Sequence, residues 1–245
     1  MKPYSPKVFL ALAFIYTSSA AVAQLQFVDV NSNNNMVRFL DPSTKGKPAA
    51  TISYNDVDGK YLWREEWYPA LVTMKVGKES KLKAARINLY TNDIHFLENG
   101  NEMSARTNKV KRIVLYSNKP SDSTVVGTFE SFVSPGTSSE GLFEVMNEGQ
   151  IRLMKRVSVI VKKEAYDALT NKDRYAFISS TDYVIQNGSV LKALKSLSKS
   201  SVFEALPESS SSEEWLSSHK NKLKKADDIV EFLNYLNGKE NKGNK

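Results

Sequence analysis

The sequence predicts a mainly β fold, in which an antiparallel curved sheet, sandwich or barrel carries a small C-terminal helical unit. Three observations lead to this prediction. Apolar and polar residues alternate from about residue 49 to residue 192, which is typical of half-buried strands. Short turn signals separate the alternating runs at close spacing, as in all-β folds. After residue 193 the apolar residues recur at the spacing of helices.

Residues 1–23 are predicted to be a secretory signal peptide. Two lysines precede an apolar run from Val8 to Tyr16, and Ala21-Val22-Ala23 is a small-residue cleavage site. We expect cleavage between Ala23 and Gln24, and export to the periplasm or the medium. The apolar run is shorter than the roughly 20 residues that span a bilayer, so it is interpreted as a cleaved signal and not as an anchor. Nothing later in the sequence is apolar enough to span a membrane, so we expect no transmembrane segment in the mature chain.

The charge and the cysteine content narrow the class of protein further. The chain has no cysteine, so an exported domain must fold on its hydrophobic core without disulfides. Its formal net charge is +7, but lysines and arginines alternate with acidic residues along most of the chain. A nucleic-acid-binding protein concentrates its positive charge on one face, so we expect no nucleic-acid partner.

Residues 24–192 are expected to form the antiparallel β domain. Asn99-Gly100 and Asn187-Gly188 are hairpin turns, because these residues tolerate the positive φ angles that tight turns require. The segment Asn147-Glu148-Gly149 is a third turn of this kind, with the glycine as its left-handed residue.

A long return strand is expected to follow that turn, from Gln150 to Lys163. Arg152 and Arg156 share one parity along this strand, so they are predicted to face solvent. Lys155 falls on the apolar face, where it either extends its ammonium group outward or marks a bulge. The residues predicted to face the core are Ile151, Leu153, Val157, Val159 and Val161.

Residues 193–238 are predicted to form the helical unit. A short helix covers "SKSSVFEAL", and a second begins at the serines of "PESSSSEEWLSSHKNK", where serine caps and early acidic residues suit a helix start. The third, "KADDIVEFLNYLNG", has an apolar stripe and ends at Gly238. We expect residues 239–245 to be a disordered tail.

Several segments resemble one family of proteins. They are "DVDGKYLWREEW" (56–67), "ARINLYTNDIHF" (85–96), "FEVMNEGQIRLMKR" (143–156), "DYVIQNGSVLKAL" (182–194) and "ADDIVEFLNYLN" (226–237). Together they are similar to a family of uncharacterised secreted or periplasmic proteins of Bacteroidota. The resemblance implies an envelope location and a β-rich body with short C-terminal helices. It implies no catalytic residues, since that family has no assigned activity.

The residues that carry chemistry show no catalytic pattern. The chain has two histidines, His95 and His219, on different expected elements and without the spacing of metal ligands, so both are interpreted as surface residues. There is no G-x-S-x-G motif, phosphate loop or dinucleotide fingerprint. We therefore expect no catalytic residue, no cofactor and no metal site.

One segment partly fits a calcium loop. In "NDVDGKYLWREE", Asp56, Asp58, Gly59 and Glu65 match positions of an EF-hand loop, but Tyr54 would occupy its first position without a carboxylate. Asp-Gly is also a common turn sequence, so the segment is interpreted as the turn that enters the first hairpin.

The aromatic segment that follows supplies the only candidate ligand or partner residues. Trp63, Trp67 and Tyr68 lie close together in "YLWREEWYP", and exposed aromatic rings are suited to carbohydrates or protein partners. The alternative is that the tryptophans cover one end of the β core, because large aromatic side chains usually pack inward. Sequence reasoning favours this second interpretation.

Three functions remain open. The first is a non-enzymatic, soluble cell-envelope protein that binds an unknown envelope protein. The second is a β-barrel or half-barrel carrier of a lipid or other apolar small molecule, with apolar strands at 125–133 and 151–161 lining its cavity. The third is a hydrolase with a dispersed site near Trp63–Trp67. The sequence favours the first, because it contains many signals of fold and no catalytic motif.

Overall fold

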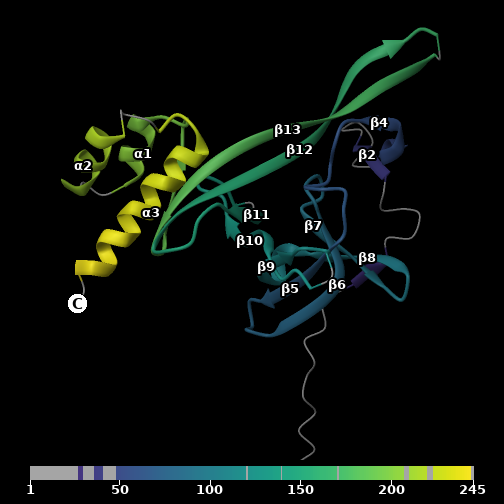
Figure 1. Ribbon diagram of the computed structural model, residues 1–245. Coiled ribbons are helices and arrows are strands. Elements are labelled where there is room, and N and C mark those ends of the chain that lie inside the picture. Colours follow the sequence, from purple (N-terminus) through teal and green to yellow (C-terminus); the bar gives the residue numbers. More distant parts are fainter. Residues whose placement is uncertain are drawn as a thin grey trace, which may run out of the picture.

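The computed structural model shows a large curved sheet, a long projecting hairpin and a group of helices near the C-terminus (Figure 1). It describes residues 27–29, 36–40, 48–119, 121–138, 140–169, 171–206, 210–219 and 223–243. The predicted signal peptide and its cleavage site lie outside these ranges. Within them, no helix combines the length and the apolar character needed to cross a bilayer.

The strands and helices follow in this order. The strands are β1 (Phe27–Asp29), β2 (Met36–Leu40), β3 (Pro48–Ser53), β4 (Val57–Asp58), β5 (Tyr68–Met74), β6 (Glu79–Asn88), β7 (Asp93–Glu98), β8 (Asn101–Arg106), β9 (Val110–Tyr116), β10 (Val125–Val133), β11 (Glu140–Val145), β12 (Ile151–Asp167), β13 (Lys172–Asn187) and β14 (Val190–Leu194). The helices are the 3-10 turns η2 (Tyr54–Asp56) and η3 (Thr107–Lys109), and α1 (Lys199–Ala205), α2 (Ser210–Ser218) and α3 (Ala226–Gly243).

In the described part of the chain, the strands form one 12-stranded sheet and a separate ribbon of β2 and β3. The main order is β1-β8-β7-β6-β5-β9-β10-β11-β12-β13-β14. β4 joins this sheet by parallel pairing with β13. The two end strands, β1 and β14, do not pair with each other, so the sheet is open. The predicted antiparallel β body with C-terminal helices is confirmed, and the sheet is not a closed barrel.

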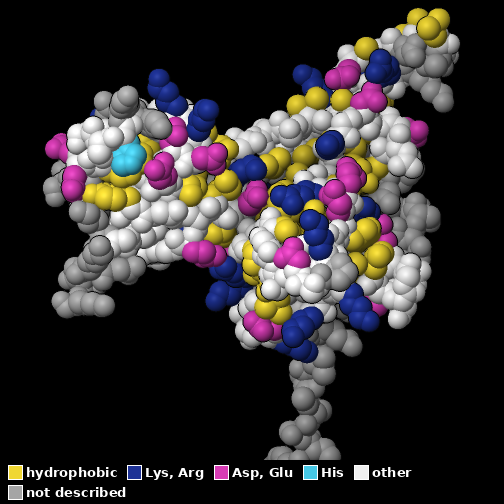
Figure 2. Space-filling model, in the orientation of Figure 1, with side chains coloured by type: hydrophobic (Ala, Val, Ile, Leu, Met, Phe, Trp, Pro, Cys, Tyr) yellow, Lys and Arg dark blue, Asp and Glu magenta, His cyan; other side chains and the backbone are white. Residues whose placement is uncertain are grey.

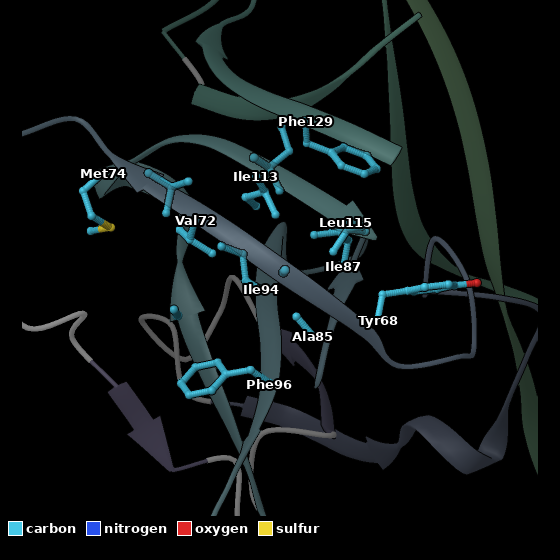
Figure 3. Close-up of a cluster of buried hydrophobic side chains, with 14 residues drawn as sticks. Tyr68, Val72, Met74, Ala85, Ile87, Ile94, Phe96, Ile113, Leu115 and Phe129 are labelled. Carbon is cyan, nitrogen blue, oxygen red and sulfur yellow. The ribbon is translucent and has the colours of Figure 1, made fainter. Parts of the chain in front are cut away.

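The first half of the sheet curves around a hydrophobic core. Burial alternates residue by residue along β5, so one face of that strand points inward. Side chains from β6 and β7 meet those of β9 and β10 in one cluster, which strands of a single sheet achieve only when the sheet curves (Figure 3). Ile94, Ile113 and Leu115 are fully buried there, so side chains fill this interior.

The longest strands form a hairpin that extends beyond the body. β12 and β13 pair with each other from Ile151↔Asn187 to Asp167↔Lys172. β11 pairs with only residues 154 and 155 of β12, and β14 with only residues 183–187 of β13. β4 pairs with residues 175 and 176 of β13, so the hairpin is a two-stranded ribbon only beyond these residues, and its far end projects from the molecule in Figure 1. We call residues 160–178 of this hairpin the arm.

The helices pack on the near end of the same hairpin. Ile151, Leu153 and Ile185 belong to one buried cluster with residues of α1, α2 and α3. The predicted apolar stripe of the last helix is buried as expected, with Phe232 and Leu233 fully inaccessible to solvent. Ser198 caps α1 by accepting the backbone N–H of Ser201 at 3.4 Å.

Two expectations about local structure have different outcomes. Asn99 and Gly100 have φ angles of 52° and 82°, as the predicted hairpin turn requires. The predicted helix end at Gly238 is corrected, because α3 continues to Gly243 and so overlaps most of the expected tail at 239–245. A mid-helix glycine costs only about 1 kcal/mol, and the lysine and glutamate that follow favour helix.

Candidate functional site

Trp63 and Tyr68, two of the three predicted site residues, line one surface pocket, and Trp67 does not. The pocket has a volume of about 350 Å³ and is also lined by Lys60, Leu62, Arg64, Glu65 and Glu66. Tyr68 is only 7% exposed, and its hydroxyl donates to a Glu66 carboxylate oxygen at 3.3 Å. Little of the tyrosine is available to a ligand.

Trp63 covers the β core, as sequence reasoning favoured. Its ring lies 5.2 Å from that of Phe129 in an edge-to-face contact, and the Arg64 guanidinium lies 4.2 Å from its centroid. A Cβ atom at Gly127 would approach the Trp63 ring to 2.7 Å, so the ring sits directly on the glycine backbone. The Trp63 ring therefore lacks the open face on which a ligand could stack.

Trp67 lies against the guanidinium of Arg86, which is 4.2 Å from the ring centroid. Arg86 continues into a chain of polar contacts: it donates to Glu102 at 2.8 Å, and Glu102 lies 2.6 Å from Nδ1 of His95. Each of β6, β7 and β8 contributes one member of this network.

His95 is buried, with 3% exposure, so its interpretation as a surface histidine is wrong. Asn88 next to it is fully buried, and its Oδ1 accepts backbone N–H groups from Tyr90 and Thr91 at 3.0 and 3.1 Å. Its Nδ2 therefore donates to Nε2 of His95, at 3.3 Å. The alternation of the sequence did not predict the burial of His95, because both faces of β7 are covered, as its run of three buried residues shows.

The network of Arg86, His95 and Glu102 links the three neighbouring strands β6, β7 and β8. With Nε2 accepting from Asn88 and Nδ1–H donating to Glu102, both ring nitrogens of His95 are occupied by the protein itself. The hydrogen bond from His95, helped by Arg86, holds the pKa of Glu102 below its usual value, so this carboxylate stays charged. A general base needs a nitrogen that can reach a substrate, and His95 has none free.

The basic hairpin at 141–156 is also built differently from the prediction. The Arg152 side chain is only 13% exposed and makes two hydrogen bonds to the Glu130 carboxylate, at 2.9 and 2.8 Å. Arg156 donates to the Ser134 hydroxyl and lies 5.7 Å from the centroid of the Phe143 ring. The prediction that both arginines face solvent is wrong, because the side chains of Glu130, Ser134 and Phe143, which lie on or next to β10 and β11, pack against them.

Lys155 neither marks a bulge nor remains unpaired. It lies opposite Glu144 of β11 and pairs with its carboxylate at 3.0 Å. The register irregularity in this hairpin falls further along, between Lys163 and Ala165. Arg152 and Lys155 are therefore explained by ion pairs within the fold, and Arg156 by its hydrogen bond to Ser134 and its contact with the Phe143 ring.

The segment that partly fitted a calcium loop is part of the sheet. Tyr54 begins the turn η2, and Asp58 ends the short strand β4. The Asp58 carboxylate pairs with Arg174 of β13 at 2.9 Å, and Gly59 follows with a φ of 97°, which suits the predicted turn. Across the described residues, no group of three side chains could hold a metal ion.

Among the residues that the structure describes, the arm is the most exposed apolar feature, and it was not predicted from the sequence. Leu169 is 97% exposed, and the arm also exposes Tyr166, Ile160 and Ile178 to a large extent. Figure 2 shows hydrophobic side chains gathered at the free end of this hairpin. A signal was present in "IVKKEAYDAL", where apolar residues continue in a charged stretch that has no cover in the expected fold.

Comparison of the chain with protein-family models, with curated proteins and with solved structures finds no match. The resemblance to a family of secreted proteins of Bacteroidota stays a prediction.

Proposed function

We propose that the protein is an exported, non-enzymatic interaction protein that binds a protein partner through the end of its β12–β13 arm. The observation that carries the proposal is the combination of a projecting arm, two-stranded beyond its short pairing with β4, with apolar side chains exposed along it. Exposed apolar groups that share one surface feature mark sites of interaction.

The arm has one covered face and one open face. Val159, Val161 and Phe177 pack on Tyr54 and its neighbours, which anchors the base of the arm to the body. On the opposite face Ile160 and Ile178 form a cross-strand pair and are 59% and 40% exposed. From residue 162 to residue 174, every side chain that the structure describes is exposed.

The shape of the arm favours a protein partner. Small molecules bind in concave pockets, whereas this surface is a ribbon that stands out from the body. Ile160, Ile178 and Leu169 are 59%, 40% and 97% exposed, so burying what remains exposed would contribute roughly 3–6 kcal/mol in total before the cost of association. A partner with a groove that accepts the ribbon would recover this free energy.

The charges on the arm argue against non-specific strand pairing. Lys162 and Lys163 lie on the outer part of β12, and an irregularity in the register follows at once. Lysines and bulges on edge strands oppose uncontrolled pairing with other chains. Recognition is therefore proposed to use the apolar side chains of the arm.

Two alternatives have less support. A carrier of apolar molecules needs an empty interior, but the curved sheet is open and its core is filled by side chains such as Ile94 and Leu115. A hydrolase near Trp63–Trp67 needs an accessible base, and the neighbouring His95 is buried with both ring nitrogens engaged.

Site-specific photo-crosslinking in cells that express the full chain tests the proposal. A crosslinking amino acid replaces Leu169 at the end of the arm, and in a control it replaces Val76, a turn residue of the body that is 76% exposed. We expect one discrete adduct with another protein from position 169 and none from position 76. The double substitution Ile160→Ser and Ile178→Ser should abolish that adduct.

Equal crosslinking from both positions would contradict the proposal, as would an adduct that survives the double substitution. An adduct with the mass of two copies of this chain would also overturn it, in favour of self-association. Circular dichroism of the double variant serves as the folding control, because both isoleucines are exposed and their loss should leave the core intact.

A further inference from the structure

A second surface pocket lies on the body, at the ends of β5, β6 and β9, and it is separate from both the arm and the Trp63 pocket. Its volume is about 460 Å³, which falls in the range of small-molecule sites. Its lining combines apolar residues of the strands with polar residues of the following loop: Pro69, Ala70, Leu71, Lys81, Leu82, Tyr116, Ser117, Lys119, Asp122 and Ser123.

Irregular strand pairing accompanies the pocket. The register between β5 and β6 shifts between Tyr68 and Ala70, next to Pro69, which has no backbone N–H to donate. The register between β9 and β10 shifts between Val125 and Gly127. Bulges turn side chains away from their regular direction, and they recur near binding sites. Here they accompany a place where Leu71 and Leu82 are left partly exposed.

The loop at the rim is held in shape by its own hydrogen bonds. Ser117 N–H donates to the Thr124 carbonyl at 2.8 Å, and Asp122 N–H donates to the Lys119 carbonyl at 3.1 Å. Asp122 in turn accepts the Thr124 N–H at 2.9 Å. Hydrogen bonds from the Thr124 hydroxyl, the Thr124 N–H and the Ser117 hydroxyl hold the pKa of Asp122 below its usual value. Asp122, the only acid among the described residues that line this pocket, is thus engaged in hydrogen bonds within the loop.

The two cations that line the pocket are not committed in this way. Lys81 on β6 and Lys119 on the loop are both exposed, and neither takes part in an ion pair among the described residues. Leu71 lies directly opposite Lys81 in the β5–β6 register, so one cation stands beside the apolar lining. The pocket therefore presents positive charge next to partly exposed leucines and the Tyr116 ring.

We propose that this pocket binds a small amphipathic carboxylate, a molecule with one apolar chain or ring and one carboxylate group. Lys81 and Lys119 pair with the carboxylate, and Leu71 and Tyr116 contact the apolar part. The lysines alone would bind weakly, because an exposed ion pair contributes at most about 1 kcal/mol. The apolar lining alone would also bind weakly, so the combination of the two selects this chemical class.

Isothermal titration of the purified mature chain with decanoate tests the assignment. We expect saturable binding with one site per chain, and binding of decanol, which lacks the carboxylate, at least fivefold weaker. The double variant Lys81→Glu and Lys119→Glu should weaken decanoate binding by tenfold or more. The matched control is Lys83→Glu, which makes the same charge change at an exposed lysine of β6 outside the pocket and should leave binding unchanged.

A second variant tests the apolar half. Leu71→Ser should weaken decanoate and decanol binding alike, because it removes part of the lining and leaves both lysines in place. The assignment is overturned if decanoate does not bind at millimolar concentration, if decanol binds equally well, or if the lysine variants and the Lys83 control behave alike. Unchanged circular dichroism spectra show that a loss of affinity is not a loss of fold.

Discussion

Replacing Glu130 with glutamine should reveal how strongly β10 is joined to its neighbours. The Glu130 carboxylate accepts from Arg112 at 2.7 Å and from Arg152 at 2.9 and 2.8 Å, and the side chains of Glu130 and Arg152 are both 13% exposed. Breaking a buried ion pair costs about 3–5 kcal/mol, because the remaining charge is left without its partner. Gln186 still accepts from Arg152, so we expect the lower limit, a loss of about 3 kcal/mol.

Urea denaturation followed by tryptophan fluorescence measures this loss, since Trp63 packs on Phe129 of the same strand. A double-mutant cycle with Arg152→Met should give a coupling free energy above about 1.5 kcal/mol, and high salt should reduce it only slightly. A solvent-exposed Arg152 would instead give a loss of no more than about 1 kcal/mol that salt removes. That result would refute the buried position of this ion pair.

Three further predictions concern the polar network, the hairpin turn and the helical core. The pKa of Glu102 is lowered in the folded state, so the ionised Glu102 stabilises the fold above its unfolded pKa, near 4.5, and this stabilisation is lost as the pH falls through the folded pKa. Glu102→Gln should therefore make the free energy of unfolding, measured in urea, depend less on pH on the acid side. Gly149→Ala should destabilise the fold by at least 1 kcal/mol in the same assay, because φ is 130° there and the new Cβ would collide with Asn237. Phe232→Ala should cost about 3–5 kcal/mol and shift the emission of Trp215, whose ring lies 5.0 Å away; an unchanged midpoint would show that the helical core tolerates the cavity.

The sequence predicted those parts of the fold that depend on local signals. Period-two alternation identified the β body, and the stripe that contains Phe232 identified the last helix. The turn at Asn99-Gly100 followed from the φ angles these residues tolerate. Each of these signals lies within a few residues of the element that it predicts.

Features that depend on distant strands were not predictable in this way. His95 is buried because Asn88 and Glu102, from the strands on either side, close around it. Arg152 is covered because β10 brings Glu130 to it, 22 positions away in the sequence. Alternation states which residues share a face, but it cannot state whether the second face is also covered.

The arm shows the same limit of prediction from the sequence, here for side chains that are exposed and not buried. A continuous β pattern through residues 150–163 predicted a strand, and it could not predict that the strand outruns its neighbours. Exposure of Ile160 and Leu169 follows from the lengths of other strands, in particular from β11, which pairs with β12 at residues 154 and 155 only.

The parallel pairing of β4 with β13 has a consequence for the order of folding. Val57 lies beside Tyr175, so this pair closes a loop that contains most of the curved sheet. Closing so long a loop is entropically expensive, and proteins rich in distant contacts fold slowly. During synthesis the cluster around Tyr54 must wait for Phe177. The cluster around Tyr54 therefore stays incomplete until the arm has been synthesised, whereas the core of the curved sheet uses only residues that precede the arm.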